Sequence, residues 1–154
     1  SVRFVIVGDG TDRMRLEALV TELGMRDVTR FTGMVEEDRM RRLLRASNVY
    51  VSTSMMDAGL ASSTGEAMAV GLPVVQTDNS DNAYWTPHGE GGFLVPNGDP
   101  ASLSVAVIRL LGDDNVRRSM GERNRQMVMR EYNMDTEMSR IESEYMRIVR
   151  KSEH

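Results

Sequence analysis

The segment NVYVSTSMMDAGLASSTGEAMAVGLPVVQT, residues 48–77, decides the fold. It opens with a β-branched run at residues 48–53 and closes with a second one at residues 72–77. Between them lie a loop rich in glycine and serine and a short predicted helix, residues 65–70, which ends at Gly71. A strand, a helix and a strand in this order, with no hairpin turn between the strands, indicate a parallel βαβ unit.

The same alternation continues on both sides of this unit. Further strands are predicted at residues 2–7, 28–32 and 92–95, and further helices at residues 12–23, 36–46, 100–111, 113–132 and 135–151. The first strand, VRFVIV, is nearly continuous in apolar residues, which is typical of a strand buried on both faces. The sequence therefore predicts a single α/β domain over residues 1–154: a doubly wound parallel sheet of about five strands with helices on both faces.

Composition excludes several classes of function. The 154 residues carry a formal net charge of −4, which disfavours a general nucleic-acid-binding role because phosphate contacts need a basic face. There is no cysteine, so disulfides and thiolate chemistry are excluded, and the two histidines are far apart in sequence, which disfavours a metal centre. No apolar run approaches the roughly 20 residues of a membrane span, and we expect a cytoplasmic protein. The first strand begins at once and without an initiator methionine, so we expect the chain to be cut from a longer protein.

A tight turn, Gly8-Asp9-Gly10, follows the first strand and precedes a helix that Thr11 or Asp12 can cap. Glycines at this place let a ligand approach the backbone, and a helix N-terminus favours anions. The dinucleotide-binding fingerprint needs a third glycine, however, and Arg13 occupies that place. The turn therefore disfavours an NAD site and leaves open a plain turn or a turn that lines another ligand.

The loop and helix of the βαβ unit carry the most specific chemistry. Gly59 frees the backbone, and hydroxyl residues at positions 62–64 lie at the predicted helix start, where free N–H groups form a cradle for a diphosphate. Glu66 is predicted in the first helical turn, where its carboxylate can accept hydrogen bonds from two vicinal hydroxyls, as on a ribose. The alternative is that Glu66 is the capping-box partner of Ser63, three residues earlier.

This segment resembles the donor-site signature of the retaining family 4 glycosyltransferases: a Glu, a Gly-rich turn, a second Glu, then Ala-Met-Ala-x-Gly-x-Pro-Val-Val. Further matches follow the order of the family along the chain: VIVGDG, ELGM, ASNVYVSTS and GEGGFLVPNGD. The resemblance covers about 140 residues, far more than one short motif. It implies the Rossmann-like C-terminal, nucleotide-sugar-binding domain of a GT-B enzyme.

The resemblance also implies roles for individual residues. Glu66 matches the second Glu of the signature, which holds the nucleotide ribose. The turn whose N–H groups meet the sugar and the diphosphate corresponds to Gly59, Leu60, Ala61, Ser62 and Ser63. Met34 and Val35 match the loop that packs near the base, and Gly8 and Gly10 form the turn after the first strand. Residues 78–82 follow the fourth strand and either line the cleft or form a solvated turn.

Two departures from the family pattern matter. The first Glu of the signature falls at Ala58, and Asp57, one position earlier, is the candidate to replace it as a catalytic carboxylate. The first βα unit of the family's domain is also absent, with the Arg and Lys that neutralise the diphosphate and with a strand that is normally inside the sheet.

The implied reaction is transfer of a hexose from a nucleotide-diphosphate sugar to an acceptor hydroxyl with retention, without a metal or a further cofactor. The acceptor would bind the missing N-terminal domain, through which any contact with a membrane would occur, so the isolated chain is expected to be inactive. Two alternatives stay open: a nucleotide-sugar epimerase of GT-B fold, which needs catalytic carboxylates and a His in the cleft, and a non-catalytic interaction module.

Overall fold

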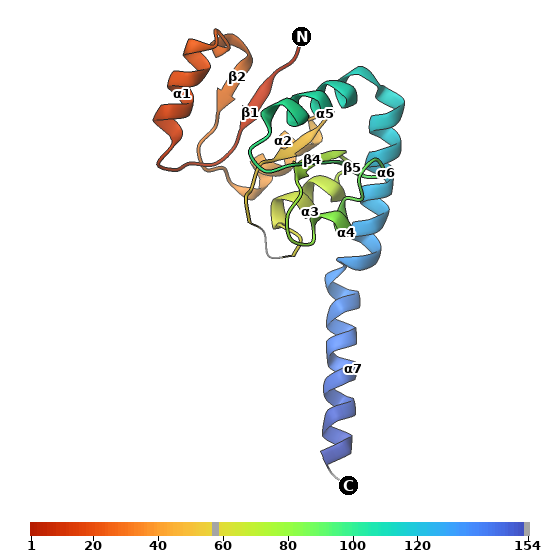
Figure 1. Ribbon diagram of the computed structural model, residues 1–154. Helices are drawn as coiled ribbons and strands as arrows, with labels where there is room; N and C mark the ends of the chain where they lie inside the picture. Colours follow the sequence, from red (N-terminus) through yellow and green to blue (C-terminus); the bar gives the residue numbers. More distant parts are fainter. Residues whose placement is uncertain (57–58, 153–154) are drawn as a thin grey trace. The chain divides into compact units, whose positions relative to one another are not determined.

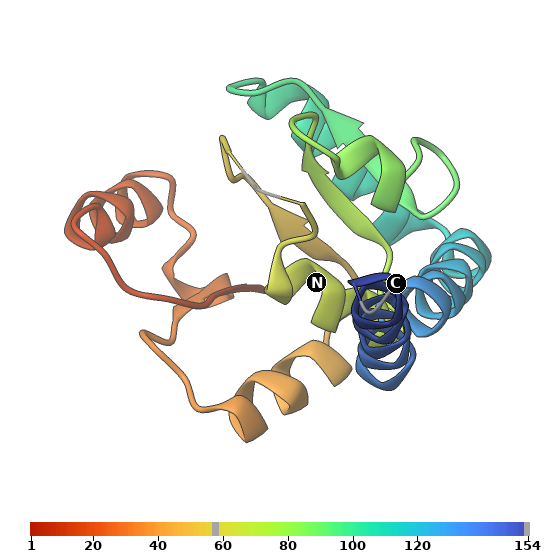
Figure 2. The same ribbon diagram turned by 90° about the horizontal axis from the view of Figure 1, so that it is seen from below.

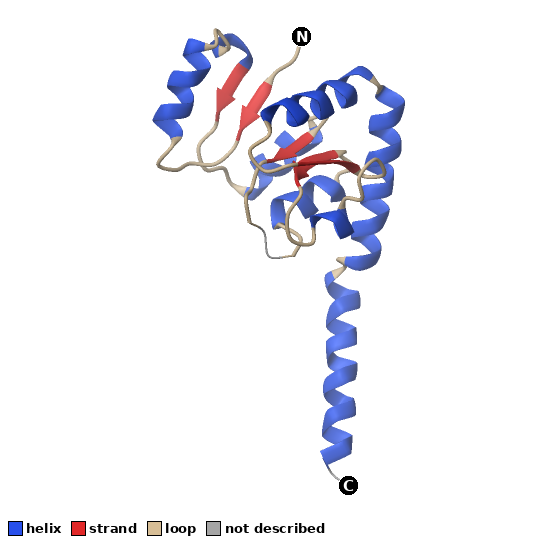
Figure 3. Cartoon of the chain, in the orientation of Figure 1, coloured by secondary structure: helices blue, strands red, loops and turns tan. Residues whose placement is uncertain are grey.

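The computed structural model describes residues 1–56 and 59–152, which divide into two compact units, residues 1–43 and residues 44 onward. Figure 1 labels the helices and strands, and Figure 3 shows how they alternate along the chain. All five predicted strands are present, and every strand pairing is parallel. The α/β fold class is therefore confirmed, and each unit holds a sheet of its own.

Unit 1 contains one small sheet and one α-helix. Its elements are β1 (Phe4–Ile6), α1 (Arg13–Glu22), a 3-10 turn at Arg26–Val28 and β2 (Thr29–Phe31). β1 and β2 pair in parallel, with Phe4 opposite Thr29. Asp12 occupies the N-cap position of α1, but its carboxylate accepts a hydrogen bond from Arg15 (3.2 Å) instead of capping the helix. The next helix, α2 (Glu37–Arg45), crosses from unit 1 into unit 2.

The prediction that the first strand is buried on both faces is wrong for this structure. Phe4, Val5 and Ile6 keep between 37% and 45% of their surface exposed. The helix beside it is likewise open: no residue of α1 is buried, and Leu23, its C-cap residue, is 60% exposed. The physical reason is size: a two-stranded sheet with one helix has too few layers to enclose apolar side chains on both faces.

Unit 2 holds the larger sheet, in the order β3-β4-β5. Its strands are β3 (Tyr50–Ser52), β4 (Val74–Thr77) and β5 (Gly92–Val95), which Figure 2 shows side by side in yellow to green. Its helices are α3 (Ser62–Ala69), α4 (Asn82–Trp85), α5 (Pro100–Gly112), α6 (Asp114–Glu131) and α7 (Met134–Ser152). The predicted helices are all present with ends within three residues of the prediction, the largest difference being the start of α3, and α4 lies in a segment predicted as loop.

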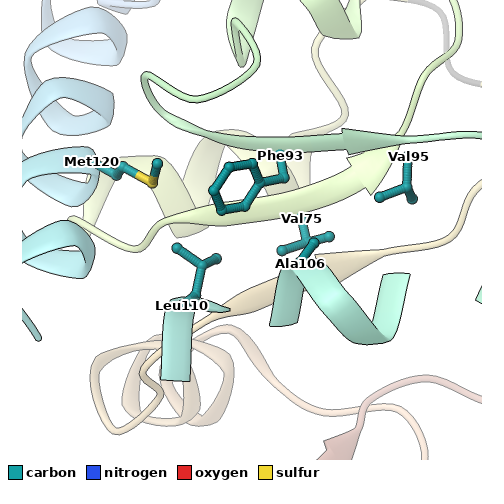
Figure 4. Close-up of a cluster of buried hydrophobic side chains, with 6 residues drawn as sticks. All are labelled: Val75, Phe93, Val95, Ala106, Leu110 and Met120. Atoms are coloured by element: carbon teal, nitrogen blue, oxygen red, sulfur yellow. The ribbon is translucent and has the colours of Figure 1, made fainter. Parts of the chain in front are cut away.

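The core of unit 2 lies on both faces of β4. Val75 points to one face, where it packs with Leu110 and Ala106 of α5, Phe93 and Val95 of β5 and Met120 of α6 (Figure 4). Its neighbour Val74 points to the other face and packs with Met68 of α3. Successive side chains of a strand alternate between faces. Helices α3 and α5 therefore cover opposite faces of this sheet, as the doubly wound prediction requires.

A buried amide joins α6 to the loops on either side of the sheet. Asn124 is fully buried, and its Nδ2 donates to the carbonyl oxygens of Leu72 (2.9 Å) and Gly91 (2.6 Å). Both acceptors are backbone carbonyls just before β4 and β5, and the Gly91 carbonyl also accepts a hydrogen bond from the Val74 N–H (3.2 Å). Burying a polar group without a partner is costly, so Asn124 fixes the position of α6 against the sheet.

The start of α5 is capped as the Asp99-Pro100 sequence predicts. The Asp99 carboxylate accepts hydrogen bonds from the backbone N–H groups of Ala101 and Ser102 (both 3.0 Å) and from the Ser102 hydroxyl (2.5 Å). The Ser102 hydroxyl and N–H, with the N–H of Ala101, hold the pKa of Asp99 below its ordinary value of 3.8. These hydrogen bonds favour the ionised carboxylate, so the cap is strongest when Asp99 is charged.

We therefore expect the stability of the protein to depend on Asp99 and on pH. A pKa that is lowered on folding contributes stability that is fully present above 3.8 and is lost as the pH falls through the lower folded-state value. Asp99→Ala should lower Tm at neutral pH, and the difference in Tm from the wild type should shrink at more acidic pH. Thermal unfolding between about pH 7 and about pH 3 checks this, and a difference that stays constant with pH would contradict it.

The last helix, α7, is exposed along its length. Two ion pairs form within the helix, between Arg140 and Glu137 (2.7 Å) and between Arg147 and Glu144 (2.8 Å). Both pairs are exposed, so each contributes little to stability. Its apolar side chains, including Met138, are also exposed. Among the described helices, α7 included, none is both long and apolar enough to cross a bilayer.

Candidate functional site

The N-terminus of α3 is an uncapped helix start. Ala61 is the N-cap residue and has no side-chain acceptor, and the first backbone hydrogen bond that closes the helix runs from Gly65 N–H to the Ala61 carbonyl (2.9 Å). The N–H groups of Ser62, Ser63 and Thr64 therefore donate to no acceptor in the described parts of the chain. The hydroxyl of Thr64 is buried there and also has no partner. This helix start can receive an anion through its N–H groups and its dipole.

The turn before α3 is held by packing. Gly59 has a φ of 76°, in the left-handed region that glycine adopts without strain. Leu60 then lies over Gly65, where an added β-carbon would be only 3.2 Å from the Leu60 side chain, and it packs against the core cluster that contains Met68. Helix α3 starts at Ser62, three residues earlier than predicted, because this packing and its buried face outweigh the low helix propensity of glycine.

Glu66 lies in the second turn of α3, not in the first turn as predicted, because the helix starts earlier. The capping-box alternative is wrong: Ser63 is inside the helix, and its hydroxyl accepts a hydrogen bond from the Tyr50 hydroxyl (2.8 Å). The Glu66 side chain is exposed, and its carboxylate forms no hydrogen bond or ion pair with any described residue. Its acceptor oxygens are thus free for a ligand.

Glu66 lines an open concavity of about 430 Å³ between α3 and the junction of α6 with α7. Four small or polar residues of α3 form one wall, and the end of α6 and the start of α7 form the other. The lining residues are Ser62, Gly65, Glu66, Ala69, Val128, Met129, Tyr132, Asn133 and Met134. Ser62 of the helix start and Glu66 therefore share one recess on the surface of unit 2, with an aromatic side chain opposite them.

Four of the other predicted site residues, Gly8, Gly10, Met34 and Val35, belong to unit 1. The N–H groups of the two glycines in the turn are already bonded. Gly8 N–H donates to the Gly33 carbonyl (3.0 Å), and Gly10 N–H donates to the Asp9 carboxylate (2.9 Å). Arg13, which stands where a third glycine was sought, forms ion pairs with Asp9 (3.2 Å) and with Glu17. The turn can line a ligand with its backbone surface, but the N–H groups of its two glycines are occupied.

The two residues predicted to pack near the nucleotide base also lie in unit 1. Met34 is 79% exposed and Val35 is half-buried. Asp57 and Ala58 lie outside the described residues, so the structure does not test whether Asp57 replaces the first Glu of the signature. Across residues 1–56 and 59–152, no group of three or more His, Asp or Glu side chains could hold a metal ion.

Two aromatic or imidazole side chains near the site have structural contacts. Trp85 packs against the core cluster that contains Met68 and meets the rings of Tyr84 and Tyr132 edge to face at 5.1 and 6.1 Å. His88 accepts a hydrogen bond at Nδ1 from the Leu94 N–H (3.2 Å). Neither contact suits a catalytic imidazole or a sugar-stacking ring.

Residues 77–82 form internal hydrogen bonds that the sequence pattern did not specify. Residues 78–82 were predicted either to line a cleft or to form a solvated turn, but Asn82 is only 1% exposed and Asn79 is half-buried. Both amides form hydrogen bonds inside unit 2. The run of Asn and Asp after a strand was a signal for side-chain hydrogen bonding to the backbone. Such a run does not reveal which carbonyl groups accept the hydrogen bonds.

Comparison with known proteins gives the family. Residues 1–127 match the model for glycosyl transferases group 1. N-acetyl-alpha-D-glucosaminyl L-malate synthase of Bacillus anthracis is 30% identical over 149 residues, which is 96% of this chain and 38% of that enzyme.

Solved structures agree with this fold. Sucrose-phosphate synthase from Thermosynechococcus elongatus superposes with a TM-score of 0.85 at 27% identity, over 96% of this chain and 38% of that one. HepE of Anabaena, solved in complex with UDP-glucose, superposes with a TM-score of 0.85 at 21% identity, over 94% of this chain and 41% of that one. This chain therefore spans about two fifths of the length of these proteins, and it belongs to the group 1 family of glycosyltransferases.

Proposed function

We propose that this chain is the donor-binding domain of a glycosyltransferase that transfers a hexose from a nucleotide-diphosphate sugar to an acceptor hydroxyl with retention. One observation carries the proposal. Three N–H groups at the start of α3 have no partner in the described chain, and the free Glu66 carboxylate lies on the same helix beside Ser62 in an open recess. A diphosphate and a ribose need this combination of donors and acceptors.

In the proposed complex the N–H groups of residues 62–64 receive the diphosphate, and Glu66 accepts hydrogen bonds from the ribose hydroxyls. As the sugar–phosphate bond breaks, negative charge grows on the leaving diphosphate. Fixed N–H dipoles at a helix start stabilise that charge without reorganising. Asp57 is proposed to contact the sugar, and Gly8, Gly10, Met34 and Val35 to contact the nucleotide. The related HepE binds UDP-glucose, which supports a nucleotide-sugar donor.

The rest of the active site is proposed to lie in the remainder of a longer protein. The chain spans 38% of the Bacillus anthracis relative, and β1 and β3 belong to separate sheets, as expected if an interior strand comes from elsewhere. We propose that an N-terminal domain supplies the acceptor site, and any contact with a membrane surface, for a cytoplasmic enzyme. Residues 1–154 alone would then bind donor weakly and turn over nothing.

Calorimetric titration of the whole enzyme with UDP, GDP and ADP sugars tests this function. We expect one nucleotide to bind with a Kd in the micromolar range and to support transfer with retention, which NMR of the product's anomeric proton would show. The isolated chain should bind the same nucleotide more weakly and show no transfer. Turnover by the isolated chain, or absence of binding to every nucleotide sugar by the whole enzyme, would refute the proposal.

A further inference from the structure

The loop after β4 is held by its own asparagine side chains. The Asn82 Nδ2 donates to the Thr77 carbonyl (2.9 Å) and to the Asn79 Oδ1 (3.3 Å). With its oxygen bonded in this way, Asn79 directs its own Nδ2 to the Ser54 carbonyl (2.8 Å) and to the Thr77 hydroxyl oxygen (3.0 Å). The orientation of the Asn79 amide is thus set by partners on both sides.

Two donors converge on the carbonyl of Ser54. Besides Asn79, the Thr77 hydroxyl donates to the same oxygen. Ser54 lies two residues beyond the end of β3, at the beginning of the loop that leads to Gly59 and the start of α3. We call this position the root of the loop. The β-ladder ends at Ser52, so the carbonyl of Ser54 needs other donors. The buried Thr77, at the end of β4, and the half-buried Asn79, in the loop after β4, supply them.

The backbone of the loop after β4 bends at Ser80, between the two asparagine residues. Ser80 has a φ of 45°, and no other non-glycine residue in the described ranges lies in the left-handed region. Such a conformation is uncommon for residues other than glycine and persists where the surroundings impose it. Asn79 and Asn82 flank the bend in sequence, and their side-chain amides meet across it.

We propose that Thr77 and Asn79 are positioning residues for the nucleotide-sugar donor, because they fix the root of the loop that carries residues 59–63. This inference rests on the proposed function. Residues 59–63 follow the loop root and are proposed to meet the diphosphate and the sugar, whereas Glu66 lies one turn further into α3, beside the buried Met68. Loosening the root should therefore weaken binding of the diphosphate and the sugar and leave binding of the nucleoside unchanged.

Matched variants of the whole enzyme test the role. Thr77→Val removes the hydroxyl at nearly constant shape, and Thr77→Ser keeps it. Asn79→Asp replaces the donor Nδ2 with an oxygen that repels the Ser54 carbonyl, and Asn48→Asp makes the same change at an exposed residue before β3. For each variant we would measure the donor KM, kcat, Tm, and the Kd of the accepted nucleoside diphosphate (UDP, GDP or ADP) and of its nucleoside.

We expect Thr77→Val and Asn79→Asp to raise the Kd of the nucleoside diphosphate and the donor KM about tenfold, with the nucleoside Kd unchanged. Thr77→Ser and Asn48→Asp should stay within about twofold of the wild type. Equal Kd values in all variants, or equal losses for nucleoside and nucleoside diphosphate, would overturn the positioning role. If Thr77→Val does not fold, comparison of the Kd values of Asn79→Asp and Asn48→Asp tests the positioning role in the same way.

The same measurements distinguish a failure of the positioning role from a failure of the proposed function. A wild-type enzyme that binds no nucleotide sugar overturns the proposed function, whatever the variants do. A wild-type enzyme that binds one, loses affinity in Glu66→Ala and keeps it in Thr77→Val and Asn79→Asp overturns only the positioning role.

Discussion

Glu66→Ala in the whole enzyme is expected to lower kcat/KM for the donor about 100-fold. The variant removes both acceptor oxygens that we assign to the ribose hydroxyls, and two hydrogen bonds to a charged group, each of roughly 1.4 kcal/mol, give this loss. The helix itself should be unaffected, because the Glu66 side chain is exposed and has no partner in the described residues. Steady-state kinetics and Tm together check the prediction.

The control for Glu66→Ala is Glu22→Ala, which removes an exposed carboxylate at the end of α1. We expect this variant to keep wild-type kinetics. Full activity of Glu66→Ala would show that the carboxylate does not bind the donor, and absence of transfer by the wild-type enzyme would favour the interaction module. An epimerase is not favoured, because it needs a His in the cleft and His88 bonds to the Leu94 backbone.

Gly121→Ala is expected to lower the free energy of unfolding by about 3 kcal/mol or more. Helix α6 crosses the turn after α3 so closely that a β-carbon on Gly121 would lie 1.9 Å from the Gly71 carbonyl oxygen. The clash is with backbone atoms of Gly71, and Gly121 is itself part of a packed helix. Gly71 has a φ of 84°, so neither segment can move aside without loss of packing. Denaturant unfolding followed by circular dichroism measures the loss.

Gly112→Ala is the matched control, because a β-carbon at the end of α5 meets no atom within 4 Å. It should leave stability unchanged or raise it slightly, since Ala is the better helix former. If both variants unfold at the same denaturant concentration, α6 does not pack on the α3 turn as described. Because α3 carries Glu66, Gly121→Ala should also reduce the fraction of enzyme that binds donor.

Much of the fold follows from the sequence. The alternation of β-branched runs with helical periodicity predicts all five strands and the parallel pairing, and Asp99-Pro100 predicts the cap of α5 that the hydrogen bonds show. These features depend on neighbours in the chain, which the sequence displays directly. Burial of the first strand was not predictable in this way, because it depends on which layers surround Phe4 and Ile6 in three dimensions.

The local geometry of the candidate site was less predictable than the fold. The helix start at Ser62 depends on Leu60 packing over Gly65, and intrinsic propensity gives no sign of that contact. The hydrogen bond that joins Tyr50 to Ser63 excludes a capping box that the spacing alone allows. The link from Asn79 to Ser54 spans 25 residues, so no local pattern could predict it.

The most direct test of the account measures the Kd of the accepted nucleoside diphosphate and of its 2′-deoxy analogue on the wild type and on Glu66→Ala. If the Glu66 carboxylate holds the ribose, the wild type should prefer the ribonucleotide about tenfold, and the variant should bind both nucleotides equally. A preference that survives unchanged in Glu66→Ala would contradict the proposal that α3 binds the ribosyl diphosphate.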